Sequence, residues 1–306
     1  MAYFRNSAVN LLNLHYGIHS IAMSSGGAFY AAYLLKAGVS APGVLAAFAL
    51  ILGGRFVIRP IVIPLAVRWG MRPLVIAGTM LSAMQYPVLA EVHGIGWTLL
   101  TLCLVSSLGD TVYWSSYHAY FAALGDHAHR GQQVSAREAI AAIVGIVSPL
   151  ATGWALVAFG PRIAFGAAAV VLLIAALPLL WTPDVAVARR VPGAFKAAIP
   201  GVLLFIADGW IATGFYFVWQ IALFLSLGEN FLAYGSALAA AALVGAISGL
   251  LLGRHIDAGH GARAAWLALG GMAMLLALRA VAVDHVALAV IANALGSLSV
   301  CLYIPT

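Results

Sequence analysis

The chain has 306 residues, of which 64% are hydrophobic and only 8% are charged. A soluble domain carries roughly a quarter charged residues, so this composition excludes an ordinary water-soluble fold and indicates lipid as the solvent. The formal net charge of +6 is therefore attributed to basic loops beside a membrane, and we expect no nucleic-acid partner.

Apolar stretches of membrane-spanning length follow one another along the chain. About 20 mostly apolar residues cross the hydrocarbon layer as an α-helix, and backbone polar groups in lipid must be satisfied within that helix. The stretches are too long for barrel strands, so we expect an all-α integral membrane protein of about ten transmembrane helices. The expected spans are 11–35, 42–66, 73–92, 96–124, 136–159, 162–182, 198–227, 231–253, 263–282 and 286–306.

Basic residues are distributed unevenly over the loops between these spans. If the N-terminus is inside, the outer loops carry Lys36, Arg162 and Arg279, whereas ten basic residues lie in inner loops. Cytoplasmic loops collect Lys and Arg, so we expect a cytoplasmic N-terminus. The inner residues are Arg5, Arg68, Arg72, Arg130, Arg137, Arg189, Arg190, Lys196, Arg254 and Arg263.

The longest polar break follows the sixth span. It divides the chain into an N-terminal six-helix bundle (1–182), a cytoplasmic linker (183–197) and an incomplete C-terminal bundle of four helices (198–306). We expect a multi-pass monomer in the lipid bilayer of the cell membrane, with the bacterial inner membrane as the favoured location.

Ionisable residues inside spans are functional candidates, because they cost roughly 3 kcal/mol or more at mid-membrane. Span one carries His15 and His19, one turn apart on one face. They could relay protons or contact solute, or they could be hydrogen-bonded residues near a wet entrance. No Cys or acid stands near them in the sequence, so we expect no metal site.

Spans two and four carry opposite charges at similar depth. Arg55 lies near the centre of the second span and Asp110 near the centre of the fourth, so the two could form a pair. That pair could be broken by solute or a proton, or it could be structural. The same stripe of the fourth span continues with Tyr113, Trp114, Tyr117 and His118, and we expect it to line a cavity.

Span seven carries a further polar face. Asp208, Tyr216 and Gln220 share it, with Trp219 alongside, and span ten contributes Asn293. We interpret all of these as candidates for lining a cavity or for proton coupling, although Asp208 could instead pair with a neighbouring helix.

Two basic loops, each after the second span of its half, have a similar pattern. They read Pro-Leu-Ala-Val-Arg-Trp-Gly-Met-Arg-Pro (64–73) and Gly-Arg-His-Ile-Asp-Ala-Gly-His-Gly-Ala-Arg (253–263). Such internal matches are typical of parallel repeats in transporters.

These loops resemble those of the major facilitator superfamily, whose pattern is Gly-x-Leu-x-Asp-Arg-x-Gly-Arg-Arg. Matching residues are Leu65, Arg68, Gly70 and Arg72 in the first copy and Gly253 and Asp257 in the second. Ile63, Val67 and Met71 depart from the pattern.

Two further stretches are similar to family patterns. Arg130-Gly131 and Arg137 resemble the loop before span five, and Gly145-x-x-Ser148-Pro149-x-x-x-Gly153 resembles the pattern of the antiporter branch, although Ser148 replaces one Gly.

The resemblance implies a fold of two six-span bundles around a cavity that opens alternately to each side. Spans one, four, seven and ten line that cavity in the family, which agrees with the polar stripes here. The chain stops at Thr306 after an apolar run, so we expect it to lack the last two spans. Arg68, Arg72, Arg130, Arg137, Gly253 and Asp257 would form cytoplasmic gating loops, with Gly70 at the first turn. The alternative is that the Arg residues only set topology.

The leading hypothesis is secondary active transport of a small organic solute, with protons as a candidate coupling ion. No phosphate-binding Gly-rich loop with Lys exists in the sequence, so we expect no nucleotide or other cofactor. A membrane-embedded transferase is the second hypothesis, with His118, Asp126, His127 and His129 as its cluster. A truncated, non-transporting homologue is the third.

Overall fold

The computed structural model describes residues 6–125, 130–188, 192–255, 261–283 and 285–303. Every regular element within those ranges is a helix, as expected. In chain order the elements are α1 (Ser7–Ala22), η2 (Met23–Gly27), α2 (Tyr30–Lys36), α3 (Ala41–Trp69), α4 (Met71–Ala90), α5 (Trp97–Leu124), α6 (Arg130–Ala158), α7 (Pro161–Ala175), η3 (Leu177–Trp181), α8 (Ala194–Ala212), η4 (Thr213–Val218), α9 (Trp219–Ser226), α10 (Phe231–His255), α11 (Gly261–Ala282) and α12 (Val286–Tyr303).

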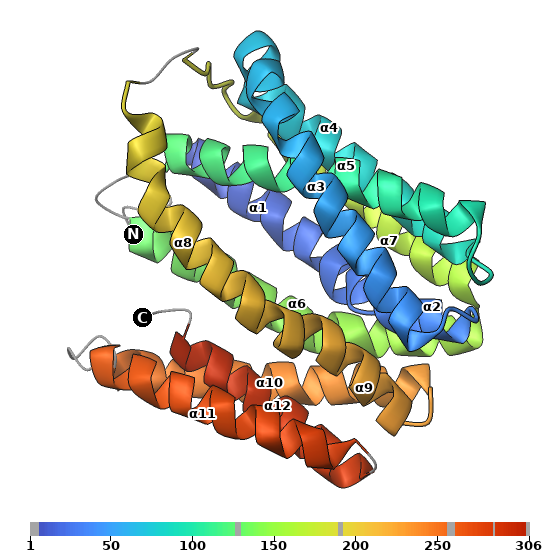
Figure 1. Cartoon of the computed structure of the whole chain (residues 1–306). Coiled ribbons are helices and arrows are strands. Elements are labelled where there is room, and N and C mark those ends of the chain that lie inside the picture. The colour runs from blue at the N-terminus through green and yellow to red at the C-terminus, as the bar shows by residue number, and fades with distance from the viewer. Residues whose placement is uncertain (1–5, 126–129, 189–191, 256–260, 284, 304–306) are drawn as a thin grey trace.

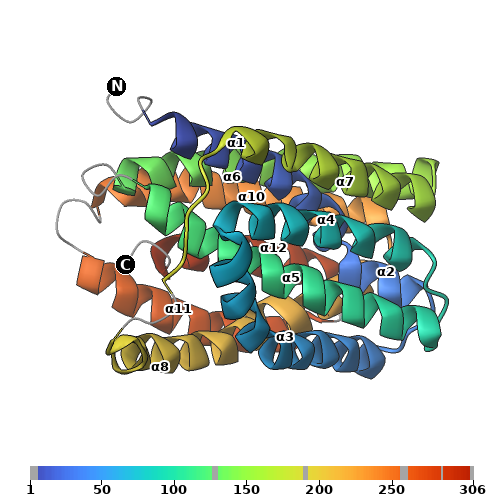
Figure 2. The ribbon, with the colours of Figure 1, turned by 90° about the horizontal axis from the view of Figure 1, so that it is seen from above.

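Helix boundaries follow local chemistry. Ser40 caps α3 by accepting a hydrogen bond from the Gly43 amide, and Pro42 stands in the first turn, where its missing N–H costs nothing. Gly160 precedes Pro161 at the start of α7. Within α3, Pro60 and Pro64 each remove one backbone hydrogen bond of the helix. Figure 2 shows that α3 bends over the second part of its length.

Several helices have the length and composition that crossing a membrane requires. Of the described residues, five stretches qualify: Ala41–Trp69, Met71–Ala90, Ala139–Ala158, Pro161–Trp181 and Phe231–Ser248. Large apolar side chains such as Phe56 and Trp97, which are 82% and 84% exposed, lie on the outer surface, where lipid rather than water is their natural surroundings. The count of ten spans, the orientation and the division into two bundles stay predictions.

The helices lie side by side (Figures 1 and 2), and we call those from α1 to η3 the first group and those from α8 to α12 the second. In the first group α5 packs against α3 and α4, while α7 packs against α1 and α4. In the second group α12 packs between α10 and α11. The groups meet where α6 runs along α10, which is the most extensive contact between them.

Two glycines let α6 and α10 approach closely. A Cβ atom on Gly153 would lie 2.6 Å from the carbonyl oxygen of Phe231, and one on Gly235 would lie 2.3 Å from that of Pro149. In lipid, helices associate through close packing of small residues rather than through a hydrophobic driving force. The Gly-rich pattern of residues 145–153 therefore has a packing role here.

Two π-helical segments occupy similar places in the two groups. η2 interrupts the first expected span between α1 and α2, and η4 interrupts the seventh between α8 and α9. A π segment breaks the regular helical hydrogen-bond pattern and is frequent at functional sites. This correspondence supports an internal repeat that the sequence shows only in its loops.

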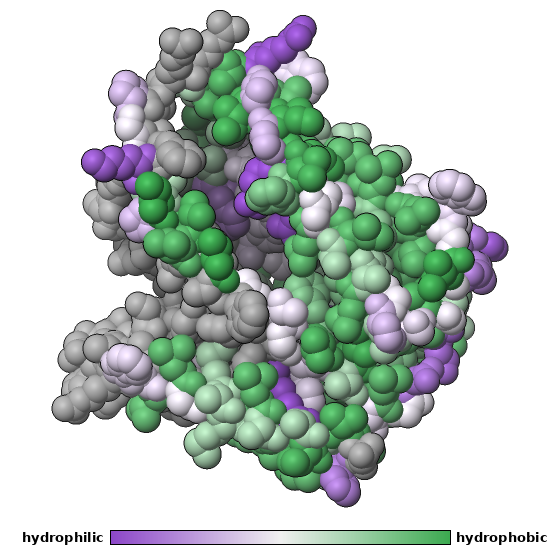
Figure 3. Space-filling view, in the orientation of Figure 1, coloured by the Kyte–Doolittle hydropathy of each residue, from purple (hydrophilic) through white to green (hydrophobic). Residues whose placement is uncertain are grey.

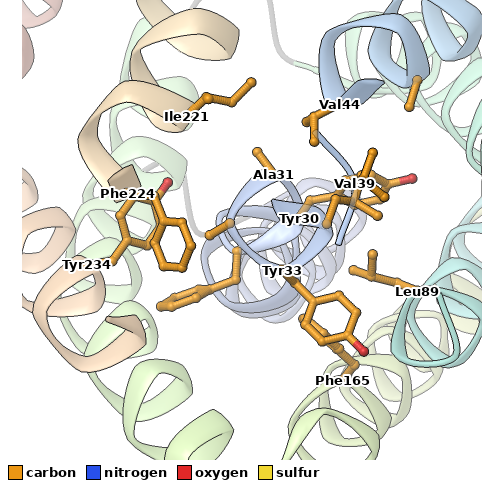
Figure 4. Packing of buried hydrophobic residues seen from close by; sticks show 14 of the residues in the cluster. Tyr30, Ala31, Tyr33, Val39, Val44, Leu89, Phe165, Ile221, Phe224 and Tyr234 are labelled. Atoms are coloured by element: carbon orange, nitrogen blue, oxygen red, sulfur yellow. The ribbon is translucent and has the colours of Figure 1, made fainter. Parts of the chain in front are cut away.

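The main apolar core joins both groups around α2. Figure 4 shows Tyr30, Ala31 and Tyr33 of α2 between Phe224 and Tyr234 on one side and Leu89 and Phe165 on the other. The Tyr234 ring meets the Phe29 ring edge-on at a centroid distance of 5.3 Å. The end of the first expected span is thus held between the two groups.

Candidate functional site

A cavity of about 130 Å³ lies where the two groups face each other. Its walls come from η2, α2, α3, α4 and α5 of the first group and from η4 of the second. Phe217 of η4 contacts Phe48 of α3 at a ring-centroid distance of 4.8 Å, which closes one side. The lining residues are Met23, Gly27, Tyr30, Phe48, Ile51, Leu52, Arg55, Gln85, Tyr86, Ser106, Asp110 and Phe217.

Arg55 and Asp110, which were predicted to lie at similar depth in their spans, both line the cavity. Arg55 Nη1 of α3 lies 3.5 Å from Asp110 Oδ2 of α5, and the two side chains are 25% and 23% exposed. The predicted pairing is therefore confirmed, and both partners border an open space. Their role in solute or proton handling stays a prediction.

Neutral polar groups beside the pair form a short hydrogen-bonded chain. The Ser106 hydroxyl donates to Gln85 Oε1 at 3.0 Å and lies 3.1 Å from the Tyr30 hydroxyl. The Tyr86 hydroxyl donates to the Ala22 carbonyl at 3.1 Å. Sequence analysis missed these four residues. Ser106 could have been found, because it stands one turn before Asp110 on the same face of the helix.

The structure divides the aromatic stripe of the fourth span into two edges. Asp110, Trp114 and His118 follow Ser106 at intervals of four residues, and they are partly or fully exposed. Tyr113 and Tyr117 lie on the adjacent edge and are 0% exposed, packed inside the first group. Only the first edge faces the open side of α5, so the stripe is part cavity wall and part core.

His15 and His19 lie inside the first group and not on the cavity. They are 0% and 1% exposed. His15 Nδ1 donates to the Ala175 carbonyl at 2.7 Å, because a carbonyl can only accept. In the neutral ring, His15 Nε2 then accepts from the Tyr113 hydroxyl at 3.0 Å. The His19 ring stacks on Tyr113 at a centroid distance of 4.2 Å.

Pro178 leaves the Ala175 carbonyl without a backbone hydrogen bond from the following turn. The chain tightens into the 3₁₀ segment η3 around Pro178, and the Leu179 amide donates to Ala176 instead of Ala175. The Ala175 carbonyl would otherwise be an unsatisfied group in the membrane, at a cost of several kcal/mol. His15 therefore has a structural partner on α7, and its role in a proton relay stays a prediction.

Residues of the second group form a separate cluster. The Trp219 indole N–H donates to Asn293 Oδ1 at 3.1 Å, and Asn293 Nδ2 donates to the Ala237 carbonyl at 3.1 Å. Arg279 lies 4.5 Å above the Trp219 ring and is 7% exposed. The expectation that Arg279 belongs to an outer loop is wrong, because it stands in the last turn of α11.

Other candidates on the seventh span are placed less fully. Tyr216 is 48% exposed, and Gln220 is partly exposed at the start of α9. Asp208 belongs to α8, but its side chain lies outside the described residues. Phe217, which sequence analysis did not single out, is the residue of this span that lines the cavity.

The first basic loop is fastened to the segment after η3. Gly70 has φ of 85°, and a Cβ atom there would lie 2.0 Å from Asp184 Oδ2, so both the backbone and the close approach require glycine. Asp184 Oδ1 accepts from the Arg72 amide at 2.9 Å, and Arg72 Nη1 donates to the Thr182 carbonyl at 3.0 Å. Asp184, missed in the sequence, thus caps α4 from another segment.

The remaining gating candidates are described only in part. Arg68 is exposed at the end of α3. Arg130 and Arg137 lie in α6, but their side chains are outside the described residues. Gly253 lies in α10, and its surroundings are not described either. Asp257 lies outside the described residues altogether. Their gating role stays a prediction.

The two ends of the molecule differ in how the groups meet. Near the α9–α10 turn, Lys36 Nζ lies 3.7 Å from Glu229 Oε2, and the Tyr234 hydroxyl donates to the Ala28 carbonyl at 3.2 Å. Toward the end where α3 terminates and α8 begins, Figure 3 shows a hollow between α3 and α8 with hydrophilic residues on its floor. The closed end and the hollowed end lie on opposite sides of the Arg55–Asp110 pair along α3.

No metal centre is formed by the residues whose placement is described, since no group of three or more His, Cys, Asp or Glu side chains gathers there.

Comparison with known proteins identifies the family. The model of the Major Facilitator Superfamily matches residues 12–305. No curated protein matches the chain at a significant level. The chain is similar in structure to a POT family transporter, PepTSo, with 15% identity and a TM-score of 0.49, covering 88% of this chain and 59% of that one. It is also similar to a D-xylose-proton symporter, with 15% identity and a TM-score of 0.59, covering 98% of this chain and 82% of that one.

The family model and the fold together describe a multi-pass membrane protein of a transporter family and not an enzyme. The chain spans only about three-fifths of the length of the POT family transporter, as its 59% coverage states. Because its match extends over nearly all of its own residues, the chain belongs to the Major Facilitator Superfamily.

Proposed function

We propose that the protein is a secondary active transporter that moves a small organic solute through the Arg55–Asp110 cavity by alternating access. In this proposal the chain crosses the membrane about ten times, with its N-terminus in the cytoplasm and with residues 1–182 and 198–306 as the two moving parts. The single observation that carries the proposal is a charged pair on a cavity between two helix groups.

The different contacts at the two ends support an inward-facing form. With the N-terminus inside, the hollow between α3 and α8 opens to the cytoplasm, and the Lys36–Glu229 end is the outer one. Rocking of the groups about the α6–α10 contact would part the outer contacts and bring the basic loops together. Each step would exchange one set of weak contacts for another, as a reversible cycle requires.

Asp110 is the proposed proton carrier. Among the residues that the structure describes, it is the acid that borders the cavity, and Arg55 is the charge that a proton on Asp110 would release. Two of the groups near it, Tyr30 and Tyr86, are hydroxyls that stay neutral at physiological pH. The structurally similar D-xylose-proton symporter bears a name that pairs a solute with protons, which makes protons the first coupling ion to test.

Flux in proteoliposomes tests the proposal. Purified full-length chain should carry at least one member of a panel of small sugars, carboxylates, amines and amino acids, and a pH gradient should drive its accumulation. Asp110→Asn should remove the response to the gradient. Asp208→Asn tests the second candidate proton carrier, which lies on α8. Glu91→Gln, on the exposed loop after α4, is a matched control for losing one acid. Well-folded protein that moves nothing in the panel would refute transport, and pH-independent flux would refute only the coupling.

A further inference from the structure

The Arg55–Asp110 pair has a different geometry from the Arg162–Glu91 pair. Arg162 donates to Glu91 through Nε and Nη2 at 2.7 and 3.0 Å, which is the two-bond contact that a guanidinium makes best with a carboxylate. The distance from Arg55 Nη1 to Asp110 Oδ2 is 3.5 Å, longer than either bond of that pair. An incoming carboxylate can therefore make a better contact with Arg55 than Asp110 makes.

Charge along the hollow favours an anion. Arg59 stands one turn beyond Arg55 on the same face of α3 and is exposed. On α5, the described side chains of the facing edge are those of Asp110, Trp114 and His118, of which one is an acid. Two guanidinium groups on the approach would raise the local concentration of anions.

The rest of the cavity suits the body of a small organic acid. Gln85 and Ser106 offer hydrogen bonds on one wall, while Phe48 and Phe217 enclose an apolar side. A volume of about 130 Å³ admits a solute of only a few non-hydrogen atoms or one aromatic ring.

Resting on the transport function proposed above, we propose that the transported solute is an organic monoanion whose carboxylate replaces Asp110 on Arg55. The solute carboxylate forms two charge-assisted hydrogen bonds with the guanidinium, and the Arg55–Asp110 contact breaks. Asp110 then borders the cavity without its counter-charge and takes a proton from water on the same side. Release of the solute restores the pair, and the proton leaves.

The step balances in charge. One negative charge on the solute and one proton cross together, so each cycle moves no net charge. Protonation of Asp110 and carboxylate binding strengthen each other, so binding should weaken as the pH rises. The groups that face Asp110 are Arg55 from α3, Tyr30 from α2 and Tyr86 from α4. The side chain of Asp208 on α8 lies outside the described residues, and Asp208→Asn separates its contribution.

Binding to full-length protein in detergent tests the solute class. The probes are benzoate and lactate, with benzamide as the neutral analogue and benzylamine as the cationic one, measured by isothermal titration calorimetry between pH 5.5 and 8.5. Benzoate or lactate should bind, and the other two should not. Arg55→Gln should weaken carboxylate binding about 30-fold or more. Asp110→Asn should strengthen it and remove its pH dependence, because the competitor for Arg55 is gone.

The same two variants reveal the opposite case. If the site takes a cation on Asp110, Arg55→Gln should strengthen benzylamine binding and Asp110→Asn should abolish it, which would overturn the proposal. Failure of both carboxylates to bind well-folded wild-type protein would also overturn it. Glu91→Gln should bind as the wild type does, and unfolding midpoints of all variants show whether a loss of binding reflects misfolding.

Flux separates this proposal from the transport function itself. If the protein carries a sugar or an amine but neither carboxylate, transport stands and the anion assignment fails. If carboxylates bind but no solute crosses the membrane, the binding site stands and the transport function fails. Carboxylate uptake that generates a membrane potential would refute the exchange at Asp110, because the proposed cycle is electroneutral.

Discussion

Two ionisable clusters contact α5, one through Tyr113 and one through Asp110, and they have opposite surroundings. His15 and His19 are enclosed by α1, α5 and α7, where hydrogen bonds to the Ala175 carbonyl and the Tyr113 hydroxyl hold His15. The Arg55–Asp110 pair borders a cavity and is held at a nitrogen–oxygen distance of 3.5 Å. His15, whose two ring nitrogens are both hydrogen-bonded, mainly fixes a structure. A loosely paired charge beside open space can instead change partners.

The largest effect should come from Asp110→Asn, which removes one charge of the Arg55–Asp110 pair and should abolish proton-driven accumulation. A gradient of one pH unit should support about tenfold accumulation of lactate in proteoliposomes if one proton accompanies each solute. Asp110→Asn should reduce the accumulation to the level of equilibration while exchange continues, because the variant cannot gain or lose the proton. Protein-free vesicles correct for diffusion of the free acid. Unchanged accumulation by the variant would mean that Asp110 is not the proton carrier.

His15→Leu should act on stability instead. It removes the hydrogen bonds of His15 with the Ala175 carbonyl and the Tyr113 hydroxyl. The loss of the first leaves a buried carbonyl unsatisfied, at a cost of about 1–3 kcal/mol. Denaturant unfolding in detergent measures the loss. The fraction that folds should keep the wild-type response to pH. A folded variant that loses this response would place His15 in the coupling path and end the contrast between the clusters.

Trp114 separates the two regions and should have an intermediate effect. Its ring meets the His19 ring edge-on at 5.7 Å and stacks with His118 at 5.4 Å. Trp114→Ala should open His19 to water and lower stability by roughly 1 kcal/mol beyond the loss of apolar packing. Labelling with diethylpyrocarbonate, read by mass spectrometry, should increase at His19. The exposed His93, in the loop between α4 and α5, should label equally in both proteins and serves as the internal standard.

The smallest effect should come from the exposed pair on the α4–α5 side. Hydrogen bonds from Arg162 hold the pKa of Glu91 below its ordinary value. A lowered pKa in the folded protein stabilises it above the ordinary pKa of a glutamate, and this contribution is lost as the pH falls through the lowered value. Because both side chains are well exposed, Glu91→Gln should leave the unfolding midpoint at pH 7 unchanged within error. A clear drop would show that surface pairs matter here as much as the cavity pair.

Much of the fold could be predicted from the sequence because lipid restricts the choice of structure. The helical stretches follow the expected spans to within a few residues, since a long apolar run in lipid can hardly be anything but a helix. The interruption η2 falls on Ser24-Ser25-Gly26-Gly27, a run of weak helix formers that sequence analysis did not use. The interruption η4 has a much weaker signal, the single Gly214. The contact between Gly235 and the Pro149 carbonyl could not be predicted, because it joins residues far apart in the chain.

The candidate site could be predicted only in part. Helical spacing placed Arg55 and Asp110 at one depth, and they do pair. Gln85 and Phe217 have no comparable signal, because a lone amide or phenylalanine in a span gives no indication of the side it faces. Asp184 was overlooked for a similar reason: its role as a cap for α4 exists only because the segment after η3 returns to Gly70.

The sequence by itself determined that this is a helical membrane protein with charges inside its spans, because hydropathy and the cost of buried charge are properties of each segment alone. Only the tertiary structure decided which charges meet open space. His15 and Asp110 stand on spans of similar composition, but the neighbours of α1 enclose the first, while the gap between α3, α5 and η4 leaves the second accessible. That difference arises from packing between distant segments, which no local pattern records.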